Sequence, residues 1–245
     1  MNAASTPPGK ARTARQRARA EITAEILASA RARLAEAGPG ELSLRAVARD
    51  VGMVSSAVYR YVASRDELLT ALLITAYDEL GAAAEAADKA VPDQTDVAAR
   101  WRATCVAVRE WAVAHPHDYA LLYGSPVTGY AAPQATVEPA TRVIVRLVQI
   151  IVAAHAAGVP APVAPATVPD GFGDAITSAR DALNRFGIDA GTDVPTELVG
   201  RTLMAWTTLF GTISFELWGH LVGSVDDSSA YYDGVVARLW DDLRS

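Results

Sequence analysis

The sequence lacks several features that mark other classes of protein. Its single cysteine, Cys105, excludes an intramolecular disulfide and any zinc or iron–sulfur site built from several cysteines. Only four Phe and eight Tyr residues occur among 245, and β-branched runs are few, so a large sheet is not expected. No run of 18 apolar residues exists, since the nearest candidate, residues 143–157, is interrupted by Arg146, Gln149 and His155. That segment predicts a buried helix instead of a membrane span.

Signatures of catalysis are missing as well. There is no glycine-rich phosphate loop and no Gly-x-Ser-x-Gly motif. His115 and His117 flank Pro116, but only Asp118 adds a carboxylate, which favours the start of a helix over a metal site. Residues 1–20 are basic and polar, so they do not form a secretory signal. We therefore expect a soluble, cytoplasmic helical protein with no catalytic residues, no metal, no cofactor and no membrane partner.

The sequence is rich in alanine, and its charges are unevenly distributed along the chain. Alanine, the best helix former, supplies 49 of the 245 residues. The net charge is −6, yet residues 1–65 carry +6 and residues 66–245 carry −12. This asymmetry predicts a basic module joined to an acidic one, and the basic module suits nucleic acid as a partner.

Helical periodicity, interrupted by glycine and proline, predicts an all-α fold. Gly38-Pro39-Gly40 ends the first helix, Ser43 is expected to cap the second, and Ser64 with Glu67 forms a capping box for the fourth. The expected helices cover about residues 13–37, 44–51, 55–62, 64–88, 95–114, 116–123, 133–157, 174–186, 195–221 and 229–243, with loops at 158–169 and 187–194.

The first helices fit a helix-turn-helix. If Leu44 is position one of a 20-residue unit, Ala48 is the small residue needed where two helices cross, and Gly52 supplies the positive φ needed in the turn. The apolar positions of the unit are filled by Val47, Val51, Met53, Val58 and Tyr61. An ordinary helical hairpin with a glycine cap is the alternative, but the basic charge of the same segment favours DNA binding.

These motifs resemble a known family. Residues 26–73, ILASARARLAEAGPGELSLRAVARDVGMVSSAVYRYVASRDELLTALL, resemble the DNA-binding domain of the TetR family of transcriptional regulators. HPHDYALLYGSPVTGY (115–130) and ISFELWGH (213–220) are similar to the regulatory domain of the TetR subgroup named after a Trp-His-Gly signature, although the order here is Trp-Gly-His. The resemblance implies three parts: a flexible basic arm (1–20), a three-helix DNA-binding domain (21–66), and a helical domain for effector binding and dimerisation (67–245).

Four residues are expected to face the bases of double-stranded DNA. In a helix-turn-helix the start of the second helix enters the major groove, which places Val54, Ser55, Ser56 and Ala57 against base edges. Ala57 is able to touch a thymine methyl group. Arg45 is expected to grip either a guanine or a phosphate, and the sequence leaves both roles open.

The DNA backbone is expected to meet a second group of residues. Tyr59, Arg60 and Tyr61 resemble the family's phosphate-clamping cluster, although Tyr61 also belongs to the core of the 20-residue unit. Arg65 and Ser43 are expected to contact further phosphates. The basic arm either follows phosphates or the minor groove, or is a solvated extension of the first helix.

The acidic domain is expected to form a homodimer and to bind an effector. Its last two helices would build a four-helix bundle with those of a second copy, so that the dimer reads a near-palindromic operator. The interface residues expected are Phe210, Ile213, Leu217 and Leu239. The family implies an effector pocket, for which we expect Trp101, Cys105, Tyr123, Ile151, Met204 and Thr208. Few charges fall on these faces, which favours an apolar or aromatic effector.

The function predicted from the sequence is therefore a ligand-responsive, sequence-specific DNA-binding regulator. The family's usual mode implies a repressor that leaves its operator when a small molecule shifts the fourth helix. A non-specific architectural DNA-binding protein is the main alternative, and a small helical enzyme is a weaker one.

Overall fold

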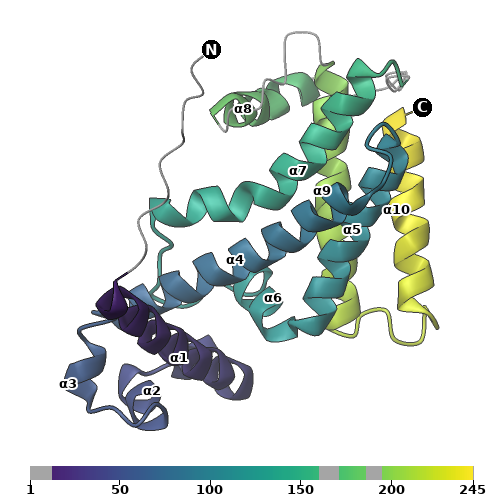
Figure 1. Cartoon of the computed structure of the whole chain (residues 1–245). Coiled ribbons are helices and arrows are strands. Elements are labelled where there is room, and N and C mark those ends of the chain that lie inside the picture. Colours follow the sequence, from purple (N-terminus) through teal and green to yellow (C-terminus); the bar gives the residue numbers. More distant parts are fainter. Residues whose placement is uncertain (1–12, 160–170, 186–194, 245) are drawn as a thin grey trace, which may run out of the picture. The chain divides into compact units, whose positions relative to one another are not determined.

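The fold is entirely helical in the part of the chain that the computed structural model describes, residues 13–159, 171–185 and 195–244 (Figure 1). The helices are α1 (Ala14–Ala37), α2 (Leu44–Asp50), α3 (Ser55–Val58), α4 (Arg65–Ala90), α5 (Val97–Ala114), α6 (Pro116–Tyr123), α7 (Val137–Ala156), α8 (Phe172–Arg185), α9 (Thr196–Leu217) and α10 (Ser228–Arg244), with short 3₁₀ helices η1 (Pro39–Glu41) and η2 (Gln134–Thr136). The all-α prediction is confirmed. No described helix is long and apolar enough to cross a membrane.

Local capping explains where several helices begin. The Thr13 side chain accepts a hydrogen bond from the backbone N–H of Gln16, and the Gln16 side chain accepts one from Thr13, so a complete capping box opens α1. At α4 the Ser64 hydroxyl accepts from the Glu67 N–H at 3.0 Å, but the Glu67 carboxylate accepts from Ala63 instead of Ser64. The predicted box at α4 is therefore present in a form shifted by one residue.

Some helix ends differ from those expected. The third helix stops at Val58 instead of residue 62, because the N–H groups of Tyr61 and Val62 both bond the Val58 carbonyl and tighten the chain into a turn. Ser43 precedes α2 but its side chain makes no capping hydrogen bond. The first helix agrees with the expected range of about 13–37, so residues 14–20 of the predicted basic arm are helical. Most of the expected loops at 158–169 and 187–194 lie outside the described residues, as does the arm before residue 13.

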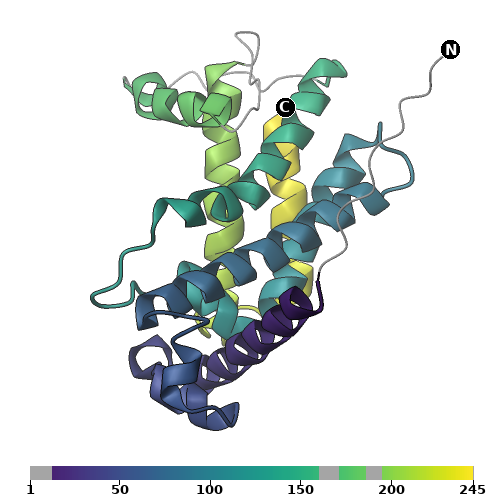
Figure 2. The ribbon, with the colours of Figure 1, turned by 60° about the vertical axis from the view of Figure 1, so that its left-hand side comes forward.

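The chain divides into two compact units. Unit 1 comprises Met1–Leu72 and, from a later part of the chain, Pro126–Tyr130; its helices are shown in purple to blue in Figure 2. Its core is made of fully buried apolar side chains from all four of its helices, Ile26, Ala30, Val47, Val58, Leu68 and Leu69. The sequence placed the end of the DNA-binding domain at residue 66 and did not assign the segment 126–130 to it.

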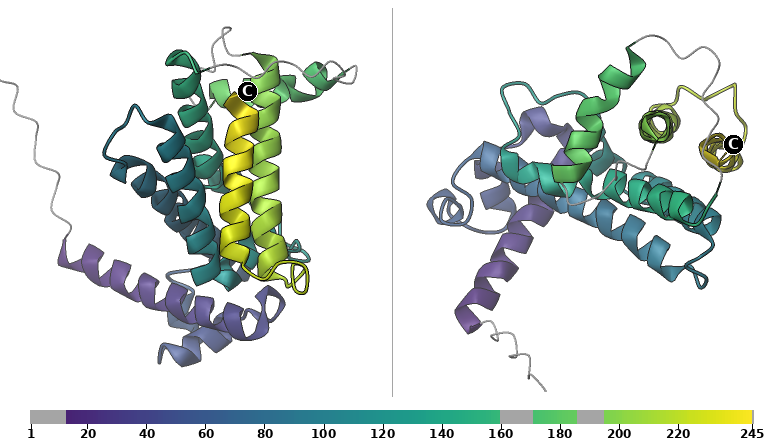
Figure 3. Two further views of the ribbon diagram at one scale, coloured as in Figure 1. Left: turned by 90° about the vertical axis from the view of Figure 1, so that its right-hand side faces the viewer. Right: turned by 90° about the horizontal axis from the view of Figure 1, so that it is seen from above.

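Unit 2 comprises Leu73–Ser125 and Ala131–Ser245. Its last two long helices, α9 and α10, lie side by side as an antiparallel pair (Figure 3), and α5, α7 and α8 pack against them. Buried polar groups join the elements: the Trp101 indole N–H donates to the Val236 carbonyl and the Tyr232 hydroxyl donates to the Cys105 carbonyl, each at 3.1 Å. These bonds attach α5 to α10 along its length.

The motif at the end of α9 has a structural explanation. Gly219 has a φ of +76°, its N–H bonds the Glu216 carbonyl, and the N–H of His220 bonds the Phe215 carbonyl at 2.8 Å. This is a Schellman motif, in which glycine takes the left-handed conformation that ends a helix. The Trp-Gly-His order therefore serves as the stop signal of α9.

Candidate nucleic-acid interface

The turn between α2 and α3 has the geometry of a helix-turn-helix. Gly52 has a φ of +67°, as its place in the 20-residue unit requires. The N–H of Met53 bonds the Ala48 carbonyl at 2.8 Å and that of Gly52 bonds Arg49, so the turn is a Schellman motif. Ala48 and Val58 are buried where the two helices cross. The turn thus fixes the direction in which α3 leaves α2.

The exposed face of this motif carries most of the predicted DNA contacts. The exposed members of the predicted set are Ser43, Arg45, Val54, Ser56, Tyr59 and Arg60, while Ser55, Ala57, Tyr61 and Arg65 are half-buried. Val54 stands out because 70% of its surface is exposed. The set offers cations, hydroxyl groups and one branched apolar group on the same unit.

Tyr61 is held by a residue that the sequence grouped with the basic arm. The Arg19 guanidinium lies 5.1 Å from the centre of the Tyr61 ring and donates a hydrogen bond to the Arg60 carbonyl at 3.1 Å. Arg19 therefore fixes the turn after α3 from the first turns of α1. The spacing of cations before residue 20 was the only sequence signal for this contact.

Arg65 has an internal role that the sequence did not indicate. Its Nε donates to the Leu42 carbonyl at 3.1 Å, and one Nη donates to the Pro39 carbonyl at 2.7 Å. These carbonyls belong to the connection between α1 and α2, so Arg65 braces that connection from the start of α4. Its expected phosphate contact would have to use the donors that remain.

A charged cluster joins α1 to α2. Arg33 binds both carboxylate oxygens of Asp50, at 2.5 and 2.7 Å, and the Ser29 hydroxyl donates to the same group at 2.9 Å. The hydrogen bonds from Arg33, followed by that from Ser29, lower the pKa of Asp50. The Asp50 carboxylate therefore binds residues of α1, while Arg45 and Arg49 of α2 are exposed cations.

The segment Pro126–Tyr130 is also part of this unit. The Tyr130 hydroxyl lies 2.8 Å from that of Thr70 on α4. Thr70 already donates its one hydroxyl proton to the Asp66 carbonyl at 2.8 Å. Tyr130 is therefore the donor in the Tyr130–Thr70 bond.

Family models match both units. Residues 26–72 match the model described as bacterial regulatory proteins, tetR family, and residues 101–239 match the model described as tetracyclin repressor-like, C-terminal domain. The HTH-type transcriptional regulators Rv1816 of Mycobacterium tuberculosis (strain ATCC 25618 / H37Rv) and Mb1846 of Mycobacterium bovis (strain ATCC BAA-935 / AF2122/97) are each 42% identical to this chain over 213 residues, which cover 84% of this chain and 84% of theirs. The chain belongs to the TetR family of transcriptional regulators.

Solved structures share the TetR fold. The regulatory protein SCO4313 has a TM-score of 0.75 and 30% identity, covering 94% of this chain and all of its own. A protein of unknown function from Rhodococcus sp. RHA1 has a TM-score of 0.68 at 24% identity, covering 91% and 96% of the two chains. RolR, solved in complex with resorcinol, has a TM-score of 0.51 at 15% identity, covering 91% and 89%. The last two likenesses show the fold alone.

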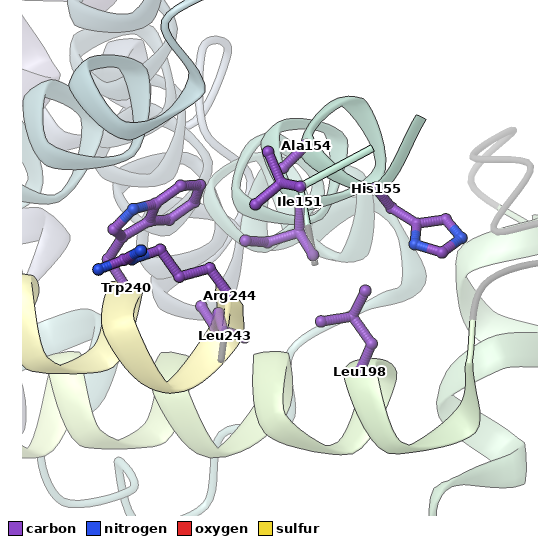
Figure 4. A pocket seen from close by; sticks show the side chains of 8 residues that line it. Ile151, Ala154, His155, Leu198, Trp240, Leu243 and Arg244 are labelled. Atoms are coloured by element: carbon purple, nitrogen blue, oxygen red, sulfur yellow. The ribbon is translucent and has the colours of Figure 1, made fainter. Parts of the chain in front are cut away.

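The six residues expected to line an effector pocket of this TetR protein lie in different surroundings. Trp101 and Cys105 are buried, and the Trp101 indole and the Cys105 backbone carbonyl are bonded to α10. Ile151 borders a small cavity beside Leu198 and Trp240 (Figure 4), with a volume of about 10 Å³, room for about one water.

Tyr123 lies in an aromatic cluster. Its ring contacts those of Tyr77, Tyr119 and Phe210, with centroids 4.6 to 6.1 Å apart, and Trp206 extends the cluster from Phe210. Burial raises the pKa of the Tyr123 hydroxyl and raises that of Tyr119 to about 12. Tyr119 donates to the Phe210 carbonyl at 2.9 Å and lies 3.0 Å from the Ser214 hydroxyl, which attaches α6 to α9.

On α9, four residues have a burial within the single chain that does not match the roles predicted for them. Ile213 is fully buried and Phe210 is 7% exposed, so these predicted interface residues pack inside their own subunit. Met204 and Thr208, predicted for the pocket, lie instead on the exposed face. Periodicity did not separate the inner face of α9 from the outer one, because large apolar residues lie on both. Leu217 and Leu239 are partly buried against the core.

Proposed function

We propose that this TetR protein is a homodimeric repressor that binds a near-palindromic operator and leaves it when a small aromatic effector binds unit 2. One observation carries the proposal: an exposed apolar stripe follows α9 at intervals of four and three residues. This α9 stripe consists of Met204, Thr208, Gly211 and Phe215 of α9 together with Trp218, which directly follows the helix. In a twofold-symmetric dimer the same surface of both subunits forms the interface, so the α9 stripe of a second copy would cover this one.

The surface beside the α9 stripe supports a second copy as its occupant. A groove of about 540 Å³ runs between α9 and α10, with Thr208, Tyr231, Gly234, Val235 and Leu239 among its lining residues. Exposed glycines lie on both helices, and a Cβ added at Gly211 or Gly234 would meet no atom of its own chain. Helices of a partner subunit are therefore able to approach closely at these points.

The dimer is tested by placing a charge in the α9 stripe. Phe215→Glu puts a carboxylate at a position that is 53% exposed in one chain and buried in the proposed dimer. We expect sedimentation to show a monomer, and operator affinity to fall by at least 100-fold because one helix-turn-helix reads few base pairs. Val113→Glu is the matched control, since Val113 is an exposed apolar residue of α5. A dimeric Phe215→Glu protein with unchanged affinity would contradict the proposal.

Operator binding is tested by selecting bound sequences from random double-stranded DNA. We expect two inverted half-sites whose centres are about 34 Å, one helical turn, apart or a multiple of it. Deleting residues 1–12 leaves α1 intact and should lower the slope of log affinity against log salt by about 0.9 for each phosphate that the shortened protein no longer binds. A selection that yields no motif would favour the architectural alternative.

An aromatic effector is supported by the cluster around Tyr123 and by the resorcinol complex of RolR, which shares the fold. Titration of the protein on its selected operator with phenolic compounds, and with phosphorylated ones for comparison, tests the class. We expect release by a phenolic compound, with a coupling of about 1–3 kcal/mol between effector and operator. Release by phosphorylated compounds alone would overturn the assignment.

A further inference from the structure

We propose that Val54 reads the 5-methyl group of a thymine in each half-site, and that this contact is the main source of base selectivity on α3. The inference rests on the proposed function, because it requires α3 to enter the major groove of a specific operator.

Folding of unit 1 does not account for the side chain of Val54. It is 70% exposed, whereas the apolar residues that hold α2 to α3 are buried or half-buried. Val54 also occupies the N-cap of α3, with φ −69° and ψ 141°, and it makes no side-chain hydrogen bond there. Ser, Thr, Asp or Asn is preferred at this position, because an oxygen bonds the free N–H groups of the first turn. A branched apolar residue here contributes neither to the core nor to the cap.

The neighbours of Val54 offer little discrimination between bases. Ser56 is exposed and Ser55 is half-buried, and a hydroxyl both donates and accepts, so it bonds the edges of several bases. Ala57 is half-buried and carries a single methyl group. The thymine methyl is the one apolar group on the major-groove edges of the four bases. Val54 is the exposed apolar group placed to meet it.

Deoxyuridine tests this contact, because it pairs as thymine does and lacks only the methyl group. Each thymine of the selected operator is replaced by deoxyuridine, symmetrically in both half-sites, and the affinity of the full-length protein is measured for each. We expect one position at which the wild type binds about fourfold more weakly per half-site, the fold-change equivalent to about 0.8 kcal/mol for one methyl-sized group. The affected thymine identifies the base pair that Val54 reads.

Val54→Ala should bring the thymine-to-uracil affinity ratio at that position close to one. The readout is a ratio for a single protein, so a general loss of affinity does not imitate it. Val222→Ala is the matched control: Val222 is 83% exposed and lies in unit 2, and this variant should keep the full ratio. Ala57→Gly tests the alternative that Ala57, which is also expected to face the bases, makes the methyl contact.

Three results would overturn the inference. A ratio in Val54→Ala that matches the wild type at every thymine excludes Val54 as the reader. Loss of the ratio in Ala57→Gly alone assigns the methyl contact to Ala57. A wild-type protein that shows no uracil effect on a well-defined operator refutes the methyl contact while leaving the proposed function intact, whereas the absence of any selected motif refutes both.

Discussion

Asp88 should be among the residues on which unit 2 depends most for stability. Its carboxylate side chain is 2% exposed and lies between two arginines of other helices. Arg100 of α5 bonds both oxygens, at 2.6 and 3.1 Å, and Arg146 of α7 bonds one at 3.2 Å. Asp88→Asn keeps the shape of the side chain and removes its charge. Two guanidinium groups then remain close together without their counter-ion.

The expected loss follows from the burial of the three groups. Removing one partner of a buried ion pair costs about 3–5 kcal/mol, because an uncompensated charge remains in a poorly solvated site. The side chains of Arg100 and Arg146 keep 13% and 21% of their surface exposed, so water relieves part of this cost. We therefore expect the free energy of unfolding to fall by about 3 kcal/mol, which is more than a hundredfold in the folding equilibrium.

Urea unfolding followed by circular dichroism at one fixed protein concentration measures this loss, since association would otherwise shift the midpoint. The control is Asp241→Asn, because Asp241 pairs with Arg244 at 2.7 Å on the surface of α10 with both side chains about half exposed. That variant should lose at most about 1 kcal/mol. Equal losses in the two variants would refute the reasoning. Adding Arg146→Met to Asp88→Asn should restore part of the stability.

Three further predictions each remove one polar contact of a side chain. Tyr119→Phe removes the buried hydrogen bond to the Phe210 carbonyl and should lower the free energy of unfolding in urea by about 1 kcal/mol. An unchanged free energy of unfolding would show that this hydrogen bond does not stabilise the protein. The Arg142 guanidinium lowers the pKa of Glu85 below its ordinary value of 4.5, so Glu85→Gln should destabilise the protein at pH 7. That difference in stability should disappear as the pH falls below 4.5 and through the lowered pKa, and a pH-independent difference would contradict the pair. Arg65→Gln should weaken operator binding without changing the salt slope, whereas a slope lower by about 0.9 per site would make Arg65 a phosphate ligand.

The sequence was most informative where one position permits few residue types. Gly52 sits where φ must be positive, and Ala48 where two helices cross, so the 20-residue unit was recognisable from spacing alone. The ends of α1 and α6 were predicted for the same reason, since glycine and proline restrict the backbone there. Local backbone constraints of this kind require no knowledge of distant contacts.

The sequence was least informative where a side chain bonds a residue far away in the chain or a backbone carbonyl. A carbonyl such as that of Leu42 carries no mark in the sequence, so nothing indicated that Arg65 would bond it. The outer face of α9 was missed for a different reason, because Met204 and Ile213 are equally apolar and only packing against α5, α7, α8 and α10 separates them. The roles predicted for Phe210, Ile213, Met204 and Thr208 all depended on that choice, while Leu217 and Leu239 remain predicted interface residues.

The segment Pro126–Tyr130 provides two further covalent connections between the two units, which matter for the effector response that we propose. The residues on either side of it, Ser125 and Ala131, belong to unit 2, so the chain passes between the units at three points: once within α4 and once at each end of this segment. Tyr130 donates to Thr70, which lies on the part of α4 inside unit 1. Any shift of α4 within unit 1 must carry this segment along or break the Tyr130–Thr70 bond. Under the proposed function, a regulatory mechanism that considers α4 alone would therefore omit two of the three covalent connections between the units.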